Sequence, residues 1–172
     1  MRIAVVGGAG GWRAVKDYKY PIWTISVLLK RMNTVNIDPC LILEVHKKAQ
    51  VDKRLELIKA SKALLVLARP HKQLPYADIL PIQKIISRYS RKCLTSSISW
   101  LIAYAGYMGV SQIDIYGVDM KTKPEYKEQR DGLFWLMGYM EAEGVRFNIP
   151  DTSKLYMPEK LYGDVNYAIK SD

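Results

Sequence analysis

The sequence predicts an α/β protein: a single Rossmann-like domain with a mostly parallel, twisted sheet and helices on both faces. Two observations support this prediction. Short apolar β-type runs alternate with segments of helical spacing, and a glycine-rich turn follows the first run. Right-handed crossovers would bring the loops after the strands to one edge of the sheet. We expect the domain to span residues 1–150 and the tail, 151–172, to pack on it.

Each element is expected where apolar spacing agrees with glycine and proline positions. The expected strands are residues 2–7, 21–25, 39–46, 63–68, 112–116 and 145–149. The expected helices are residues 25–32, 51–62, 82–89, 97–108 and 125–143. Glycines follow the last two helices, as is typical of helix ends. Three prolines indicate that residues 70–81 form a loop.

The composition is typical of a globular domain, since 49% of the 172 residues are apolar and 25% are charged. No apolar run approaches the roughly 20 residues that span a bilayer. The N-terminus carries a strand-like run rather than a signal peptide, so we expect a cytoplasmic location and no membrane partner. Cys40 and Cys93 lack metal or redox spacing and are expected to be reduced thiols.

The net charge of +9 has two interpretations. Lys and Arg form clusters at residues 47–48, 53–54, 88–92 and 121–123. A basic surface raises the encounter rate with anions, including nucleotides and DNA. A plain solvated surface explains the charge equally well, because no Arg-rich tail or nucleic-acid-binding motif accompanies it.

The segment 93–120 is the most informative part of the chain. Its expected helix begins with three hydroxyl residues, Thr95, Ser96 and Ser97. Unpaired N–H groups and a positive dipole at a helix start suit a phosphate. Gly117 and Asp119 follow a central strand, where open α/β sheets bind ligands. Asp119 would bind a sugar hydroxyl, cap the next helix, or bind a metal with help from other ligands.

The glycine-rich turn contains Gly7, Gly8, Gly10 and Gly11. Glycines after a first strand let the backbone approach a nucleotide closely. The spacing differs from G-x-G-x-x-G, and no acidic residue stands at the usual end of the second strand, so the turn does not predict NAD binding. The alternative interpretation is a plain tight turn.

Two titratable residues end the third expected strand. Glu44 and His46 are two residues apart, so their side chains should project to the same side. A carboxylate and an imidazole at the ligand edge suit general acid–base catalysis, and His46 is the better base near neutral pH. The alternative is a strand-end histidine whose hydrogen bonds are satisfied within the fold.

Cationic residues follow the next strand. Arg69, His71 and Lys72 would clamp a phosphate or an acceptor, or would form a solvated basic loop. The loop and helix after Asp119 add three further candidates, Lys121 for phosphate or acceptor binding and Tyr126 and Glu128 for catalysis. The sequence shows no metal-binding motif, so a metal-free mechanism is expected.

The TSS–helix–glycine–strand–YGVDM block, within residues 94–126, resembles the short Rossmann-type bacterial sialyltransferases that modify lipooligosaccharide. It is also similar to the Rossmann-like domains of archaeal hydroxymethylpterin pyrophosphokinases and flagellar motility accessory factors, and to small phage proteins. The sialyltransferase resemblance implies that Gly7, Gly8 and Gly10, together with Thr95 and Ser96, hold the donor's nucleotide. It also implies that Tyr126 assists the leaving phosphate.

The chain departs from the sialyltransferase pattern in three ways. The asparagine of the glycine turn is replaced by Gly8 or Ala9, the late catalytic histidine is absent near Pro124, and the chain is shorter. The resemblance therefore implies a nucleotide-dependent transferase in which His46 or Glu128 replaces the missing base.

The sequence thus predicts a nucleotide-sugar-dependent, glycosyltransferase-like enzyme that transfers a sugar to a hydroxyl acceptor. Hydroxymethylated phage DNA would suit the positive charge, in the host cytoplasm if the protein is phage-encoded. The nucleotide sugar would be a substrate, with no permanently bound cofactor and no requirement for a divalent metal. Exposed Tyr and Trp would allow a homodimer. The alternatives are a non-catalytic module that sequesters a nucleotide and a pyrophosphokinase-like transferase that uses magnesium and ATP.

Overall fold

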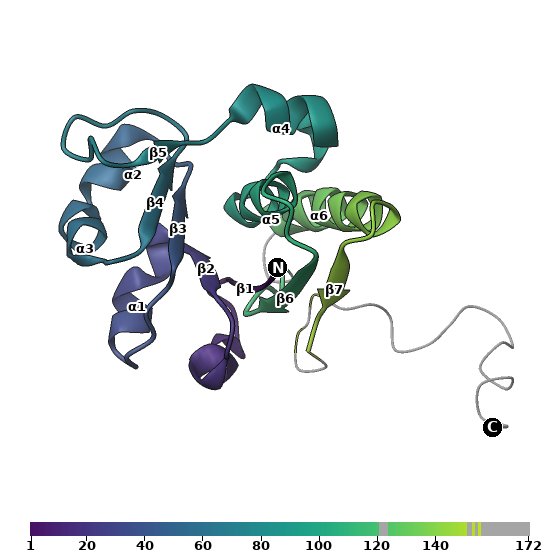
Figure 1. The fold of residues 1–172 in the computed structure, drawn as a ribbon, viewed down its shortest axis with the longest axis horizontal. Coiled ribbons are helices and arrows are strands. Elements are labelled where there is room, and N and C mark those ends of the chain that lie inside the picture. The colour runs from purple at the N-terminus through teal and green to yellow at the C-terminus, as the bar shows by residue number, and fades with distance from the viewer. Residues whose placement is uncertain (121–123, 151–152, 154, 156–172) are drawn as a thin grey trace, which may run out of the picture.

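Seven parallel strands form one sheet in the described part of the chain, in the order β5-β4-β3-β2-β1-β6-β7 (Figure 1). The computed structural model describes residues 1–120, 124–150, 153 and 155, with the backbone alone for residues 124–127. The strands are β1 (Arg2–Val6), β2 (Ile22–Ile25), β3 (Leu41–Glu44), β4 (Leu64–Leu67), β5 (Asp78–Ile79), β6 (Gln112–Tyr116) and β7 (Arg146–Asn148). The predicted α/β class with a parallel sheet is confirmed.

Across the described residues, helices lie in most of the crossovers between the parallel strands, and the connection from β4 to β5 has none. They are α1 (Leu29–Asn33), α2 (Lys48–Asp52), α3 (Leu55–Ala60), α4 (Ile82–Tyr89), α5 (Ser97–Tyr107) and α6 (Pro124–Ala142). Short 3-10 helices span Trp12–Asp17, Ser26–Leu28 and Arg91–Cys93. In Figure 1, α1, α2 and α3 lie on one side of the sheet and α5 and α6 lie on the other, so both faces are covered.

Two elements differ from the sequence prediction. The single helix expected over 51–62 is two helices, because the backbone at Arg54 (φ −117°, ψ 5°) leaves the helical region. The loop expected over 70–81 contains β5, where Leu80 N donates to Leu67 O at 2.8 Å. The prolines at 70, 75 and 81 leave residues 78 and 79 free to pair with β4, which protects the edge of that strand.

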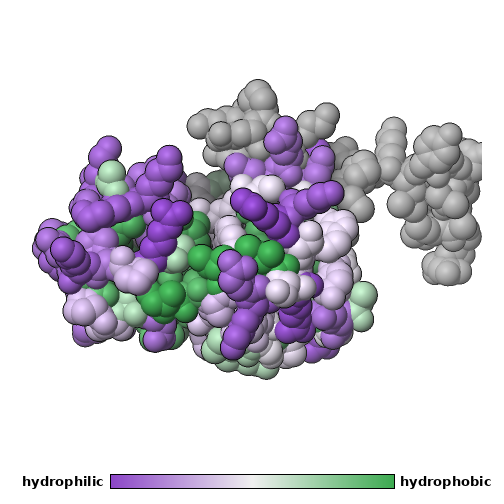
Figure 2. Space-filling view, turned by 90° about the horizontal axis from the view of Figure 1, so that it is seen from above, coloured by the Kyte–Doolittle hydropathy of each residue, from purple (hydrophilic) through white to green (hydrophobic). Residues whose placement is uncertain are grey.

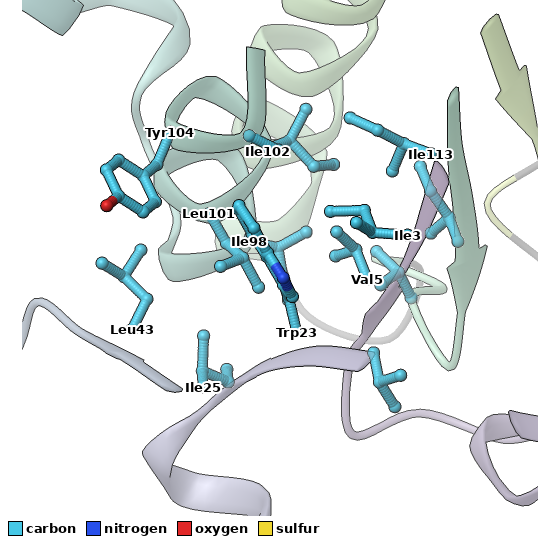
Figure 3. Close-up of a cluster of buried hydrophobic side chains, with 14 of the residues drawn as sticks. Ile3, Val5, Trp23, Ile25, Leu43, Ile98, Leu101, Ile102, Tyr104 and Ile113 are labelled. Carbon is cyan, nitrogen blue, oxygen red and sulfur yellow. The ribbon is translucent and has the colours of Figure 1, made fainter. Parts of the chain in front are cut away.

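The core divides into two layers because side chains alternate along each strand. Leu41 and Leu43 of β3 pack toward α5, whereas Ile42 joins Ile58 of α3 and Leu65 of β4 on the opposite face. Figure 3 shows the α5 side, where Ile98, Leu101 and Ile102 meet side chains of β1, β2 and β3. Helix α5 is buried along most of its length, so its N-terminus is held firmly against the sheet.

The strand order places a switch point in the middle of the sheet. From β1 the chain first builds β2, β3, β4 and β5 on one side and then adds β6 and β7 on the other. The chain therefore continues from β1 and from β6 toward opposite edges of the sheet, and open α/β sheets bind ligands at the carboxyl ends of the strands at such a point.

Of the predicted tail, only Ser153 and Leu155 fall within the described residues. Ser153 Oγ donates to Val118 O at 3.1 Å, and Leu155 is buried. The rest of the tail lies outside the described residues, and the predicted domain limits stay a prediction.

No helix in the described part of the chain is long and apolar enough to cross a membrane. On the face drawn in Figure 2, hydrophilic residues surround a central group of apolar residues.

Candidate functional site

A crevice of about 790 Å³ lies at the switch point. Its polar wall contains nine residues that the sequence predicts for the site: Gly7, Gly8, Gly10, His46, Thr95, Ser96, Ser97, Gly117 and Asp119. Its apolar wall comes from the ends of β2 and β3 and from α5, with Ile25, Val27, Val45, Ile98 and Trp100. The structure therefore brings together the glycine turn, the start of α5, the end of β3 and the loop after β6.

Gly7 and Gly117 shape the crevice by packing against each other. A Cβ on Gly7 would lie 2.5 Å from Gly117 O, and a Cβ on Gly117 would lie 2.5 Å from Gly7 O. Gly117 also has a positive φ of 61°, which favours glycine. Ala9 N donates to Gly117 O at 2.7 Å. The absence of side chains at these two positions therefore lets the loops after β1 and β6 meet. The fold itself requires glycine at both positions.

The remaining glycines of the turn differ from one another. Gly10 faces open space, with no atom within 4 Å of a Cβ built there. Gly8 O accepts a hydrogen bond from an Arg31 guanidinium nitrogen at 2.9 Å, which places an exposed cation beside the turn. Gly11 does not line the crevice. It is the N-cap residue of the 3-10 helix that follows, with a φ of 79°. Gly8 and Gly10 thus bring backbone without side chains to the crevice, on either side of Ala9.

Helix α5 begins with a capping box that uses the Ser96 hydroxyl within the protein. Ser96 Oγ accepts from Ser99 N at 3.1 Å, and Ser99 Oγ accepts from Ser96 N at 2.9 Å. No acceptor for the N–H groups of Ser97 and Ile98 is found among the described residues. These two N–H groups, the exposed Thr95 and the half-buried Ser97 are therefore the groups that an anion would meet at this helix start.

His46 is oriented by Glu44, and the two side chains project to the same side, as their spacing predicted. Both the backbone N and the ring Nδ1 of His46 contact Glu44 Oε1, at 2.7 and 2.5 Å. Because a carboxylate only accepts, Nδ1 is the ring nitrogen that donates to Glu44, which leaves Nε2 as the nitrogen that can accept. Nε2 lies 3.4 Å from Ser97 Oγ. The basic nitrogen of the imidazole therefore points toward the start of α5.

Glu44 is fixed by two residues that the sequence analysis did not identify. Ser26 Oγ donates to Glu44 Oε2, and an Arg54 guanidinium nitrogen lies 3.4 Å from the same oxygen. Burial of the Glu44 carboxyl raises its pKa, but the hydrogen bonds from His46 and Ser26 outweigh burial and hold the pKa below its ordinary value. The position of Ser26 directly after β2 is the signal that would have found it.

The basic residues after β4 are divided by the fold. Arg69 and His71 line a second cavity of about 110 Å³, whereas Lys72 is exposed and lines neither cavity. His71 is buried, and its Nε2 lies 2.9 Å from Asp52 Oδ1. The second cavity borders the first, because His46 lines both.

The helix after Asp119 contributes differently from the prediction. Glu128 is exposed and does not line the crevice, whereas its neighbour Gln129 does. The backbone of Tyr126 belongs to α6, and its side chain and Lys121 lie outside the described residues. Within the described part of the chain, no group of three or more His, Cys, Asp and Glu residues could hold a metal ion.

No protein-family model matches the chain, and no curated protein sequence matches it. Among solved structures, it is similar to the sialyltransferase CstII from Campylobacter jejuni, in complex with the substrate analogue cytidine-5'-monophosphate (CMP). The TM-score is 0.57 at 11% sequence identity, and the match covers 90% of this chain and 81% of that one. The similarity shows the Rossmann-like α/β fold that the sequence predicts. The expected relation to pterin pyrophosphokinases and to phage proteins stays a prediction.

Proposed function

We propose that this protein binds a nucleotide sugar in the crevice and transfers the sugar to a hydroxyl group. One observation carries the proposal: a single crevice contains both an anion-suited helix start and an imidazole whose basic nitrogen points toward it. The likeness to the fold of a sialyltransferase whose structure contains CMP supports it.

The donor's phosphate would lie at the start of α5. The N–H groups of Ser97 and Ile98 and the hydroxyl of Thr95 would contact its oxygens, and the helix dipole would favour their charge. The missing side chains at Gly8 and Gly10 would allow the nucleoside to approach the backbone closely. These donors become more effective as the phosphate leaves with the nucleotide, because negative charge develops on its oxygens at that moment.

His46 would act as the general base. The acceptor oxygen attacks the anomeric carbon of the sugar, the bond between that carbon and the phosphate oxygen breaks, and the nucleotide leaves with the bonding electrons. The proton of the acceptor hydroxyl passes to His46 Nε2, which can accept it because Nδ1 is the ring nitrogen that donates to Glu44; the acceptor hydroxyl would replace Ser97 Oγ as the neighbour of Nε2. The Glu44 carboxylate then stabilises the imidazolium that forms. This sequence of steps uses no metal ion.

The proposal is tested by nucleotide release from a panel of nucleotide sugars, with and without small hydroxyl acceptors and magnesium. His46→Ala should abolish most of the release, whereas Glu128→Gln should not change it, because Glu128 is exposed and outside the crevice. Tight nucleotide binding without turnover would contradict catalysis and favour the sequestering module. Magnesium-dependent consumption of ATP would favour the pyrophosphokinase-like transferase.

A DNA acceptor is a narrower proposal, which the net charge of +9 supports. Charge reversal at the exposed Arg91 and Lys92 should reduce transfer to hydroxymethylated DNA and leave transfer to a small acceptor intact. Equal loss on both acceptors would contradict a DNA-specific contribution of this basic cluster.

A further inference from the structure

The second cavity shares His46 with the crevice and lies between the ends of β3 and β4 and helix α2. Its lining consists of Glu44, His46, Lys48, Val51, Leu67, Arg69, Pro70 and His71. At about 30 Å³ for each water molecule, a volume of 110 Å³ corresponds to about four waters. The cavity therefore accommodates a small group such as a carboxylate or a phosphate, rather than a whole nucleotide.

The negative charge of Asp52 beside this cavity is neutralised within the fold. Lys48 Nζ lies 2.8 Å from one Asp52 oxygen, and His71 Nε2 lies 2.9 Å from the other. His71 Nδ1 accepts from Gln73 N at 3.3 Å, so Nε2 is the ring nitrogen that donates to Asp52. The hydrogen bonds from Lys48 and His71 lower the pKa of Asp52. Asp52 is thus ionised and balanced by Lys48.

Arg69 gives the second cavity an excess of positive charge. Glu44 is held by His46, Ser26 and Arg54, so its charge is also balanced. Arg69 is exposed, lines the cavity, and has no ion-pair partner among the described residues. A guanidinium group matches carboxylate and phosphate in geometry as well as in charge.

We propose that this cavity binds an anionic group of the acceptor, so that the substrate class is an acidic sugar carrying a carboxylate or a phosphate. The proposal rests on the transferase function proposed above. With the anion at Arg69 and the donor at α5, the acceptor would extend past His46, which lines both cavities. Its hydroxyl would then reach Nε2 beside the donor.

The test uses the two histidines of the chain as reporters, because His71 lines the second cavity and His46 lines both. The imidazole NMR signals of the full chain are recorded during titrations, without donor, with glucuronate, glucose 6-phosphate and glucose. Saturable shifts of His71 with either acid, and none with glucose, are expected. The two acids show whether carboxylate or phosphate is preferred.

Arg69→Gln should weaken binding of the preferred acid about tenfold, as expected for the loss of one charge-assisted hydrogen bond. Lys72→Gln is the matched control, since Lys72 is exposed three residues away and lines neither cavity. In turnover, Arg69→Gln should raise the KM for the acidic acceptor and leave the KM for the donor unchanged. If Arg69→Gln and Lys72→Gln weaken binding of the acid equally, the proposal is overturned. The binding would then come from the general positive charge of the surface.

Failure of this subsite is distinguishable from failure of the proposed function. If donors are turned over but neither acid shifts His71, the anion subsite is wrong and the transferase stands. If the acids bind with the expected dependence on Arg69 but no donor is turned over, the cavity binds anions and the transferase is wrong.

Discussion

Two buried carboxylates on strands of the sheet make the same kinds of contact and differ in what those contacts lead to. Glu44 on β3 and Asp114 on β6 both have side chains that are 0% exposed. Glu44 contacts a serine hydroxyl and an arginine, whereas Asp114 contacts a tyrosine hydroxyl and an arginine. In each case burial raises the pKa of the carboxyl, but the hydrogen bonds lower it by a larger amount. Both pKa values therefore lie below their ordinary range.

The difference lies in the remaining partner. Gln112 completes the contacts of Asp114, and neither it nor Arg2 nor Tyr18 lines either cavity. Glu44 instead fixes an imidazole whose second nitrogen points toward the start of α5 in the crevice. Of these two buried carboxylates, the one that belongs to the candidate site is therefore the one whose partner has a further polar atom facing a ligand-sized cavity.

The largest expected effect is on catalysis. His46→Ala should lower kcat by about 10²–10⁴-fold, the usual contribution of a general base. Nucleotide affinity should be unchanged, because the phosphate would be bound at α5. The measurement is steady-state nucleotide release together with equilibrium binding of CMP. A parallel loss of affinity and of kcat would instead make His46 a binding residue.

Asp114→Ala should show the opposite behaviour, with lost stability and intact chemistry. It leaves Tyr18 and Arg2 without their acceptor, and we expect a loss of about 2–3 kcal/mol in the free energy of unfolding, below the usual cost because Arg2 is partly solvated. Urea denaturation measures this loss. The kcat of the folded fraction should equal that of the unsubstituted protein. A reduced kcat would contradict the purely structural role of Asp114.

Glu44→Gln should have an intermediate effect on activity. The amide still accepts from His46 Nδ1 but no longer stabilises the imidazolium, so kcat should fall about tenfold, which corresponds to one charge-assisted hydrogen bond. The pH profile of kcat should move as well, because the imidazole loses a neighbouring negative charge. A lower kcat with an unchanged pH profile would indicate a purely structural contribution.

The smallest expected effect is on stability in acid. Both carboxyls have lowered pKa values in the folded state, so their contribution is complete above the unfolded pKa near 4 and is lost as pH falls through the folded values. Asp114→Asn and Glu44→Gln should each reduce the slope of stability against pH below about pH 4.5. Unfolding curves between pH 3 and 6 measure this slope, and unchanged slopes would contradict the stated cause.

The sequence placed residues at or just after strand ends together, and the structure finds them lining one crevice. Gly7, His46 and Gly117 follow β1, β3 and β6, and strand ends meet at one edge of a parallel sheet. It did not predict Arg54, because the break between α2 and α3 that brings it toward Glu44 depends on tertiary contacts. Nor could it pair Arg2 with Asp114, since 112 residues separate them and neither residue belongs to a motif.

The most direct test of the account is a CMP titration followed by the backbone amide NMR signals of the full chain. The account predicts saturable shifts at residues 7–10, at Ser97 and Ile98, and at 117–120, all of which line the crevice. It predicts no shifts around Asp114 and Tyr18, where the other buried carboxylate lies. The absence of shifts with CMP and with other nucleotides, or shifts confined to residues outside the crevice, would contradict the assignment of the crevice as a nucleotide site.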